Sequence, residues 1–282
     1  MVAPPVAPRE APDVPLVDTH AHLNDRRFAR DVDAAVRRAQ AAGVVGMVVV
    51  GYDLPSSRTA VRLANQYDAV RAAVGIHPHH AKEASPAAMA EIERLAGDDR
   101  VVAIGECGLD FYRDLSPRPA QLAAFEVHLD LASRLGLPVV VHCRDAMAET
   151  LGTLEGNCPS GGGVMHCFDG TADDVQRVVA LPFYVSAAGP LTFRRDGPLA
   201  AAIAAVPPDR LVIETDCPWL SPLGHRGERN EPAYVRLVAE AAAAVCGAEL
   251  PELARRTSQN AARLFRTPAL AGAALAALGS VA

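Results

Sequence analysis

Short runs of apolar residues alternate with amphipathic stretches along most of the chain, and this alternation limits the fold more than any other feature of the sequence. The runs are rich in Val, Ile and Ala, and most of them are continuous, without the polar residues that mark a strand with one face in water. Eight runs are predicted to be strands, at residues 15–20, 44–50, 70–76, 101–106, 137–143, 163–168, 182–187 and 210–215.

The stretches between these runs carry helix signals, such as an Asp at the start of 31–43 and a Gly at its end. Helices are predicted at 31–43, 56–67, 85–97, 120–136, 145–156, 171–180, 197–206, 231–245 and 249–265. Strictly alternating units predict an α/β fold with a parallel sheet, and eight of them predict a single (β/α)8 TIM barrel. The alternative is an open doubly wound sheet, which usually has a Gly-rich turn after its first strand. Here THAHLND follows the first run.

The barrel domain is predicted to span residues 15–266, between a Pro-rich tail (1–14) and an Ala-rich tail (267–282). The first tail has no apolar segment like that of a signal peptide, and the second is too short to cross a bilayer. Six cysteines are scattered without a CxxC pair, which favours a reducing, cytoplasmic location. The net charge of −6 argues against a protein that coats nucleic acid, so any such contact should be local.

Polar residues follow five of the predicted strands at their carboxyl ends. They are Asp18, His20 and His22 (first strand), Glu106 (fourth), His142 (fifth), His166 (sixth) and Asp216 (eighth). Residues two apart on a strand share a face, so His20 and His22 can converge. A lone histidine or carboxylate at a strand end is more often a hydrogen-bonded structural group. Four histidines and two carboxylates on one predicted rim instead favour a site for two divalent ions, for which Zn, Mn and Mg remain open.

The same residues lie in segments that closely resemble the signature blocks of the TatD family of metal-dependent deoxyribonucleases. The blocks are DTHAH (18–22), GIHPHHA (75–81), GECGLDFY (105–112), HCRDA (142–146), HCFDG (166–170), ETDCPWLSP (214–222), RGERNEP (226–232) and TSQNAARLF (257–265). The resemblance covers about residues 15–266. It implies a TIM-barrel hydrolase of the amidohydrolase-like group, acting as a 3'-5' exonuclease on single-stranded or damaged DNA.

The resemblance also implies a ligand set. His20, His22 and Asp216 would hold one ion, and His142 and His166 the other. Glu106 would bridge the two ions. Two such ions can activate a water and stabilise an in-line displacement. Asp216 is expected to accept the proton of that water, because it can touch both an ion and the water.

A phosphodiester also needs positive charge or hydrogen-bond donors nearby. His77, after the third predicted strand, is similar to a substrate-contact histidine of the family. Arg113, Arg144 and Arg226 are further candidates for substrate binding, although a solvated loop arginine is an equally good interpretation of each. The expected substrate is DNA or a small phosphodiester bound at the metal site, with no membrane contact and no obligate protein partner. Asp18, Asp110 and Glu231 are expected to be structural or to orient ligands.

Other functions remain open at this point. An ester or amide hydrolase, such as a D-aminoacyl-tRNA deacylase, would use the same metal core, and aromatic residues at the rim would instead favour nucleic acid. The aromatic candidates are Phe111, Tyr112, Phe168, Phe193 and Trp219. A non-catalytic barrel would have lost ligands, and a bridging carboxylated lysine is disfavoured because the one lysine, Lys82, follows the third strand.

A cysteine follows each of four candidate ligands: Cys107, Cys143, Cys167 and Cys217. Neighbours on a strand face opposite sides. The cysteines are therefore predicted to point away from the site, into the layer between strands and helices, where a free thiol behaves as a small apolar group.

Overall fold

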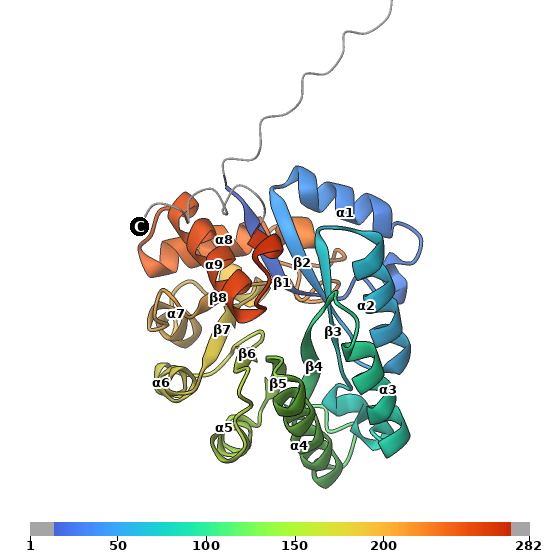
Figure 1. The fold of residues 1–282 in the computed structure, drawn as a ribbon. Helices are drawn as coiled ribbons and strands as arrows, with labels where there is room; N and C mark the ends of the chain where they lie inside the picture. Colours follow the sequence, from blue (N-terminus) through green and yellow to red (C-terminus); the bar gives the residue numbers. More distant parts are fainter. Residues whose placement is uncertain (1–13, 272–282) are drawn as a thin grey trace, which may run out of the picture.

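The computed structural model describes residues 14–271, and within them eight parallel strands form a nearly closed barrel surrounded by helices (Figure 1). Each strand pairs with the next one along the chain. The strands are β1 (Leu16–Ala21), β2 (Val44–Val50), β3 (Val70–Val74), β4 (Val101–Asp110), β5 (Val139–Arg144), β6 (Gly163–Met165), β7 (Phe183–Ala187) and β8 (Leu211–Ile213). The predicted TIM-barrel class is confirmed.

The helices alternate with the strands and lie on the outside of the barrel (Figure 1). They are α1 (Val32–Ala41), α2 (Leu54–Gln66), α3 (Pro86–Ala96), α4 (Arg118–Leu135), α5 (Met147–Gly156), α6 (Ala172–Ala180), α7 (Pro198–Ala204), α8 (Val235–Cys246) and α9 (Leu250–Leu264). Short 3-10 helices are η1 (Arg26–Phe28), η2 (Pro78–Glu83), η3 (Gly189–Phe193), η4 (Pro232–Tyr234) and η5 (Pro268–Ala271). None of the helices in the described part of the chain is both long and apolar enough to cross a membrane.

The first and last strands meet where the barrel closes. The Thr19 hydroxyl donates to the carbonyl of Ile213 at 3.0 Å, and an isolated parallel bridge joins Ala21 to Cys217. The backbone N–H of Asp216 donates to His20 O at 2.9 Å. Closure thus brings the segment after β8 against the end of β1, and with it Asp216 against His20.

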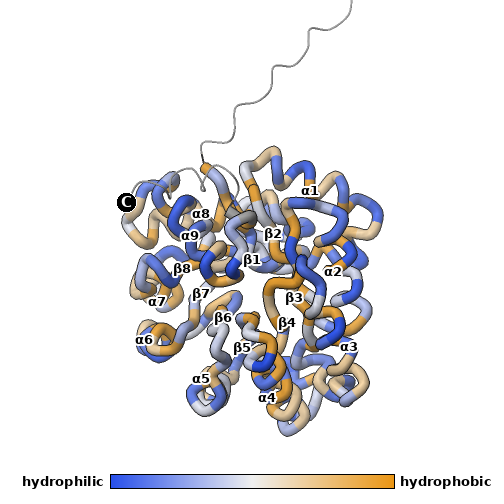
Figure 2. The backbone as a smooth tube through the Cα atoms, viewed as in Figure 1, coloured by the Kyte–Doolittle hydropathy of each residue, from blue (hydrophilic) through white to orange (hydrophobic). Residues whose placement is uncertain are grey.

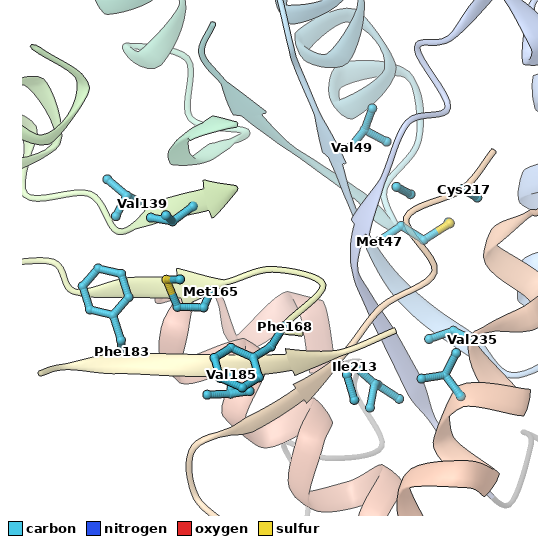
Figure 3. Packing of buried hydrophobic residues seen from close by; sticks show 14 of the residues in the cluster. Met47, Val49, Val139, Met165, Phe168, Phe183, Val185, Ile213, Cys217 and Val235 are labelled. Carbon is cyan, nitrogen blue, oxygen red and sulfur yellow. The ribbon is translucent and has the colours of Figure 1, made fainter. Parts of the chain in front are cut away.

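Two apolar layers hold the barrel together. The layer between strands and helices contains Met165, Val185 and Ile213, which Figure 3 shows on neighbouring strands. The other layer fills the barrel interior with residues such as Val140 and Val164. In Figure 2, β3 and β4 are mostly hydrophobic, whereas the helices mix hydrophobic and hydrophilic residues, as expected of elements with one face in water.

The end of the barrel away from the strand carboxyl termini is closed by the last described residues of the chain. Leu264 and Phe265 of the α9 end pack into the interior layer together with Leu270 of η5. A Cβ added at Gly46 would lie 2.4 Å from the carbonyl oxygen of Leu270, so this close approach requires glycine in β2. Packing therefore continues past residue 266. The predicted domain boundaries stay a prediction, since most of both tails lies outside the described residues.

Several predicted strands differ in length from the observed ones. β6 ends at Met165 and β8 at Ile213, so His166 and Asp216 lie in the turns that follow and not on the strands. β4 instead continues to Asp110, beyond its predicted end at 106. In each case the residues still lie at the carboxyl end of the barrel, so the change in strand length does not move them away from the predicted rim.

Candidate metal centre

Histidine and carboxylate side chains from six strand ends converge at the carboxyl end of the barrel. Three groups have ligand atoms within 4.8 Å of one another: His20, His22 and Asp216; His20, Glu106 and His166; and His77, Glu106 and His142. All six predicted ligands are in this cluster, and His77 joins them. The structure therefore brings together the residues that the sequence singles out.

Glu106 reaches the centre because β4 is irregular around it. The pairing register of β4 with β5 shifts between Ile104 and Cys107, as at a bulge, which re-aims a side chain. Gly105 and Gly108 flank this segment with φ values of 135° and 131°. A Cβ at Gly108 would lie 2.0 Å from the carbonyl oxygen of His142, so glycine is what lets β4 lie this close to β5 and its histidine.

The two oxygens of Glu106 face different histidines. Oε2 lies 3.4 Å from His20 Nε2 and 3.6 Å from His22 Nε2. Oε1 lies 2.8 Å from His166 Nε2 and 3.0 Å from His142 Nδ1. The carboxylate therefore stands between two pairs of imidazoles, with one oxygen toward each pair.

Within each pair the ring nitrogens approach one another. His20 Nε2 and His22 Nε2 are 3.0 Å apart, and His142 Nδ1 and His166 Nε2 are 3.1 Å apart. Asp216 completes the first pair, with Oδ1 3.4 Å from His22 Nε2. Ring nitrogens that lie this close together beside a shared carboxylate are expected of histidines that bind one cation, and not of histidines buried only for packing.

Partners on the far side of three rings orient them toward the centre. His22 Nδ1 donates to the carbonyl of Val50 at 2.8 Å, and His142 Nε2 donates to Asp110 Oδ2 at 3.1 Å. His166 Nδ1 donates to Glu214 Oε1 at 3.2 Å. Carbonyl and carboxylate oxygens only accept, so the far nitrogens carry hydrogens, and whenever the rings are neutral the near nitrogens present lone pairs to the centre. This is the arrangement found around metal-bound histidines.

Glu214 is the orienting residue that the sequence reasoning missed. It is fully buried, and it also accepts from the backbone N–H of Cys167 at 2.8 Å. The available signal was its spacing, because Glu214 stands two residues before Asp216 at the end of a strand. Of the residues expected to orient ligands, Asp110 does so, whereas Glu231 is paired with Arg38 at 2.6 Å. Asp18 accepts hydrogen bonds from the hydroxyl and the backbone N–H of Thr215, and these bonds join the first strand to the segment after the last one.

The cluster is electrostatically coupled. Burial alone would raise the pKa of Glu106, but its interaction with the surrounding histidines, foremost with His166, holds that pKa well below its ordinary value. Burial likewise opposes protonation of His166, yet Glu106 and Glu214 raise its pKa well above 6.5. Asp216 has a lowered pKa because the hydrogen bond from His22 and the nearby histidines outweigh its burial. The carboxylates of Glu106 and Asp216 are thus ionised and need positive charge nearby, which is the electrostatic setting of a cation site.

His77 differs from the other histidines in its hydrogen pattern. Its Nδ1 accepts from the backbone N–H of His79 at 3.0 Å, so the hydrogen of the neutral ring is on Nε2. Nε2 lies 3.4 Å from Glu106 Oε1. Burial, which outweighs the attraction of Glu106, lowers the pKa of His77 well below its ordinary value, so the ring stays neutral. His77 therefore points a donor, and not a lone pair, into the site.

A pocket of about 680 Å³ opens over the cluster. Arg113 and Arg144 line it, together with Arg194, which the sequence reasoning did not single out. In the described part of the chain, none of these three guanidinium groups is paired with a carboxylate. Arg226 is not among the lining residues, and its guanidinium lies 4.8 Å from the ring centre of Phe193.

The predicted orientation of the cysteines is wrong for Cys167, which lines the pocket. Cys107 and Cys217 are buried in the layer between strands and helices, and Cys143, at the edge of the pocket, packs against the same layer, as expected. The reason at Cys167 is that β6 ends at Met165, so strand alternation no longer applies, and the residue adopts a φ of 42°. Burial raises the pKa of the Cys167 thiol well above its ordinary value, which leaves it protonated and a poor nucleophile.

A barrel of this kind, with a buried cluster of imidazoles and carboxylates at the carboxyl ends of its strands, defines a metal-dependent hydrolase. The chain belongs to the TatD related DNase family, whose family model matches residues 17–266.

Individual relatives cover nearly the whole domain. The chain is 41% identical to the "uncharacterized metal-dependent hydrolase YabD" of Bacillus subtilis, over 89% of this chain and 99% of that protein. It is 38% identical to the "3'-5' ssDNA/RNA exonuclease TatD" of Erwinia tasmaniensis, over 89% and 99% of the two chains. Among solved structures, YJJV, a TatD homologue from Escherichia coli K12, superimposes with a TM-score of 0.86 at 28% identity, over 90% and 98% of the chains.

Proposed function

We propose that this protein is a 3'-5' exonuclease that removes nucleotides from single-stranded DNA with the help of two divalent cations. The observation that carries the proposal is the position of Glu106, whose two oxygens face two separate pairs of histidines. Its similarity to a relative named as a 3'-5' ssDNA/RNA exonuclease supports this choice of substrate. The six cysteines, all free in the structure, support a reducing cytoplasmic setting.

The residues fit the two ions as follows. His20, His22 and Asp216 would hold one ion, His142 and His166 would hold the other, and Glu106 would serve both. Imidazole-rich ligation suits Zn, and the carboxylates also admit Mn or Mg. When bound, two such ions act as Lewis acids on the phosphate and on the attacking and leaving oxygens of an in-line displacement.

Asp216 is the proposed proton acceptor. Its side chain is 14% exposed, against 4% for Glu106, so Asp216 is the more accessible of these two pocket-lining carboxylates. The lowered pKa of Asp216 keeps it ionised at neutral pH and able to accept a proton from a water molecule in the pocket. Glu106 also lines the pocket, but both of its oxygens are engaged by histidines, so it is the less available acceptor.

His77, Arg113 and Arg144 are proposed to bind the phosphate. His77 presents the Nε2 hydrogen toward the site and, because it is neutral, adds no positive charge that would repel the cations. Arg113 and Arg144 line the pocket and have no carboxylate partner within residues 14–271, so they can bind phosphate oxygens without first breaking an ion pair there. Arg226, held on Phe193 outside the pocket lining, is at most an outer contact.

The test is activity of chelator-treated protein to which Zn, Mn or Mg is added back singly. Single-stranded DNA labelled at the 5' end, the same strand labelled at the 3' end, and a D-aminoacyl-tRNA serve as parallel substrates. We expect loss of activity on chelation, recovery with at least one metal, and a ladder of 5'-labelled products that shortens from the 3' end. Hydrolysis of the D-aminoacyl-tRNA alone would overturn the proposal.

A further inference from the structure

The pocket over the metal centre has a second wall that is made of apolar side chains. Six of its lining residues come from β7, η3, α7 and the turns that join them: Ala187, Ala188, Pro190, Leu191, Leu199 and Ile203. We call these six residues the apolar wall. None of them is a metal-ligand type, and none has a polar side chain, so the cation chemistry proposed above leaves the wall unexplained.

The wall is fixed directly to the segments that carry the ligands. The backbone N–H of Glu214 donates to the carbonyl of Ala187 at 3.0 Å, and the N–H of Phe168 donates to the carbonyl of Ser186 at 3.1 Å. Figure 3 shows Phe168, two residues after His166, lying beside Val185 of β7. Single backbone hydrogen bonds therefore join β7, at the start of the wall, to the segments that follow β6 and β8.

A close backbone approach brings the loop after β8 against the same wall. A Cβ at Gly189, the first residue of η3, would lie 2.0 Å from the carbonyl oxygen of Leu220. The N–H of Leu223 donates to the hydroxyl of Thr192 in η3 at 2.8 Å. The loop that begins with Asp216 and carries Trp219 is thus clamped onto η3. Trp219 and Leu220 of this loop line the same pocket as the apolar wall and the metal centre.

We infer that the apolar wall binds the nucleobase of the 3'-terminal nucleotide, the one released by cleavage. This inference rests on the proposed exonuclease function and specifies its substrate site. A nucleobase has two apolar faces, which such a wall can cover, and stacking or apolar contact of this kind does not depend on which base is present. The whole pocket, at about 680 Å³, lies in the size range of sites that enclose a small molecule.

The charges around the wall favour a nucleotide over an apolar acyl group. Arg194 caps η3 and lines the pocket, and it has no carboxylate partner among the described residues. On the opposite side, the Arg144 guanidinium lies 3.9 Å from the ring centre of Tyr112. Cations beside an apolar surface match a base that is joined to an anionic phosphodiester backbone. The wall offers no side-chain hydrogen bonds to base edges, so the site should accept all four bases.

The test compares removal of a normal 3'-terminal nucleotide with removal of an abasic (tetrahydrofuran) one from otherwise identical single strands. We expect wild-type kcat/KM to be about 10-fold higher for the strand with the base, within a range of about 5- to 100-fold. An abasic residue at the 5' end should change the rate little. The identity of the 3' base should change kcat/KM by less than about 3-fold, since no side chain of the wall reads its edge.

Two variants locate the effect. Leu199→Trp, on α7, narrows the pocket at the wall and should bring the ratio between base-bearing and abasic ends close to one. Leu199→Ala, which cannot clash, should lower the ratio by a smaller factor and serves if the tryptophan variant does not fold. Leu122→Trp, the same change on an exposed position of α4, is the matched control and should keep the wild-type ratio. Metal content and circular dichroism check that each variant is folded and loaded.

The outcomes separate this inference from the proposed function. Wild-type protein that degrades DNA with a ratio near one overturns the base site and leaves the exonuclease standing. A high ratio that neither Leu199 variant changes overturns the location of the base on this wall. Protein that degrades no oligonucleotide at all, with any metal, overturns both.

Discussion

The two ends of the barrel use the same inward-facing positions for opposite purposes. At the carboxyl end these positions hold buried titratable groups such as His20, Glu106 and His166. At the amino end they hold Val17 and other apolar residues, sealed by Phe265 and Leu270. Burying polar groups at the carboxyl end destabilises the folded state, whereas burying apolar residues at the amino end, which we call the floor of the barrel, stabilises it. We therefore expect substitutions at the carboxyl end to remove activity and substitutions at the amino end to remove stability.

The largest effect is expected for Asp216→Asn. The amide cannot accept the proton of a water molecule, so kcat at saturating metal should fall by about 10²- to 10⁴-fold while the barrel stays folded. The measurement is exonuclease rate against metal concentration, which separates weaker metal binding from a slower reaction. Glu228→Gln, the same change on an exposed residue of the loop after β8, should keep the wild-type rate. Full activity of the Asp216 variant would show that another group takes the proton.

The opposite behaviour is expected for Leu270→Ala at the floor. Loss of a buried leucine leaves a cavity inside the barrel, which should lower the free energy of unfolding by about 2–5 kcal/mol in urea denaturation. Activity per folded molecule and metal content should not change. Leu135→Ala, at an exposed position at the end of α4, should change stability by less than about 0.5 kcal/mol. If Leu270→Ala instead lost metal at unchanged stability, the division between the two ends would be wrong.

His128 gives a third test, because it is a buried histidine near the site that serves packing and not binding. Its Nδ1 donates to the carbonyl of Ala124 at 2.7 Å, and its Nε2 accepts from the N–H of Ile76 at 3.0 Å. Burial lowers its pKa from 6.5 to about 4. Between these two values the unfolded chain binds the extra proton, so the stability contributed by neutral His128 is complete above pH 6.5 and is lost as the pH falls toward 4.

The size of this effect follows from the two pKa values and is about 3 kcal/mol between pH 7 and pH 4. Urea denaturation across this range should show a steeper loss of stability for the wild type than for His128→Gln, which has no titrating ring. The difference between the two slopes isolates His128 from the histidines of the metal centre, which both proteins share. Parallel slopes would mean that His128 does not change protonation on unfolding.

The sequence predicts the barrel and the six ligands because both depend on local pattern. Continuous Val-rich runs mark buried parallel strands, and ligands at strand ends must meet at one rim. It does not predict where each strand stops, since the lengths of β6 and β8 are set by pairing with their neighbours; this is why Cys167 was expected to point outward. Nor does it reveal Glu214 as a partner of His166, because that contact joins two turns that only the closed barrel brings together.

The sequence also does not predict which rim arginines face the pocket, and two of them provide the last comparison. Arg144 and Arg226 both follow barrel strands in the sequence, yet only Arg144 lines the pocket. Arg144→Ala removes an unpaired cation and its contact with Tyr112. We expect KM for single-stranded DNA to rise about 10-fold, close to 1.4 kcal/mol, with less change in kcat. Arg226→Ala removes a charge of the same sign from the Phe193 contact and should raise KM less than about 2-fold at physiological salt, where charges beyond about 8 Å are screened.

Measuring both arginine variants at low and moderate salt makes the comparison sharper. A direct phosphate contact persists when distant charges are screened, so the ratio of the two KM values should remain large as the salt rises. If the ratio instead collapses toward one, the two arginines act only through the general field of the rim, and the position of Arg144 in the pocket has no special role.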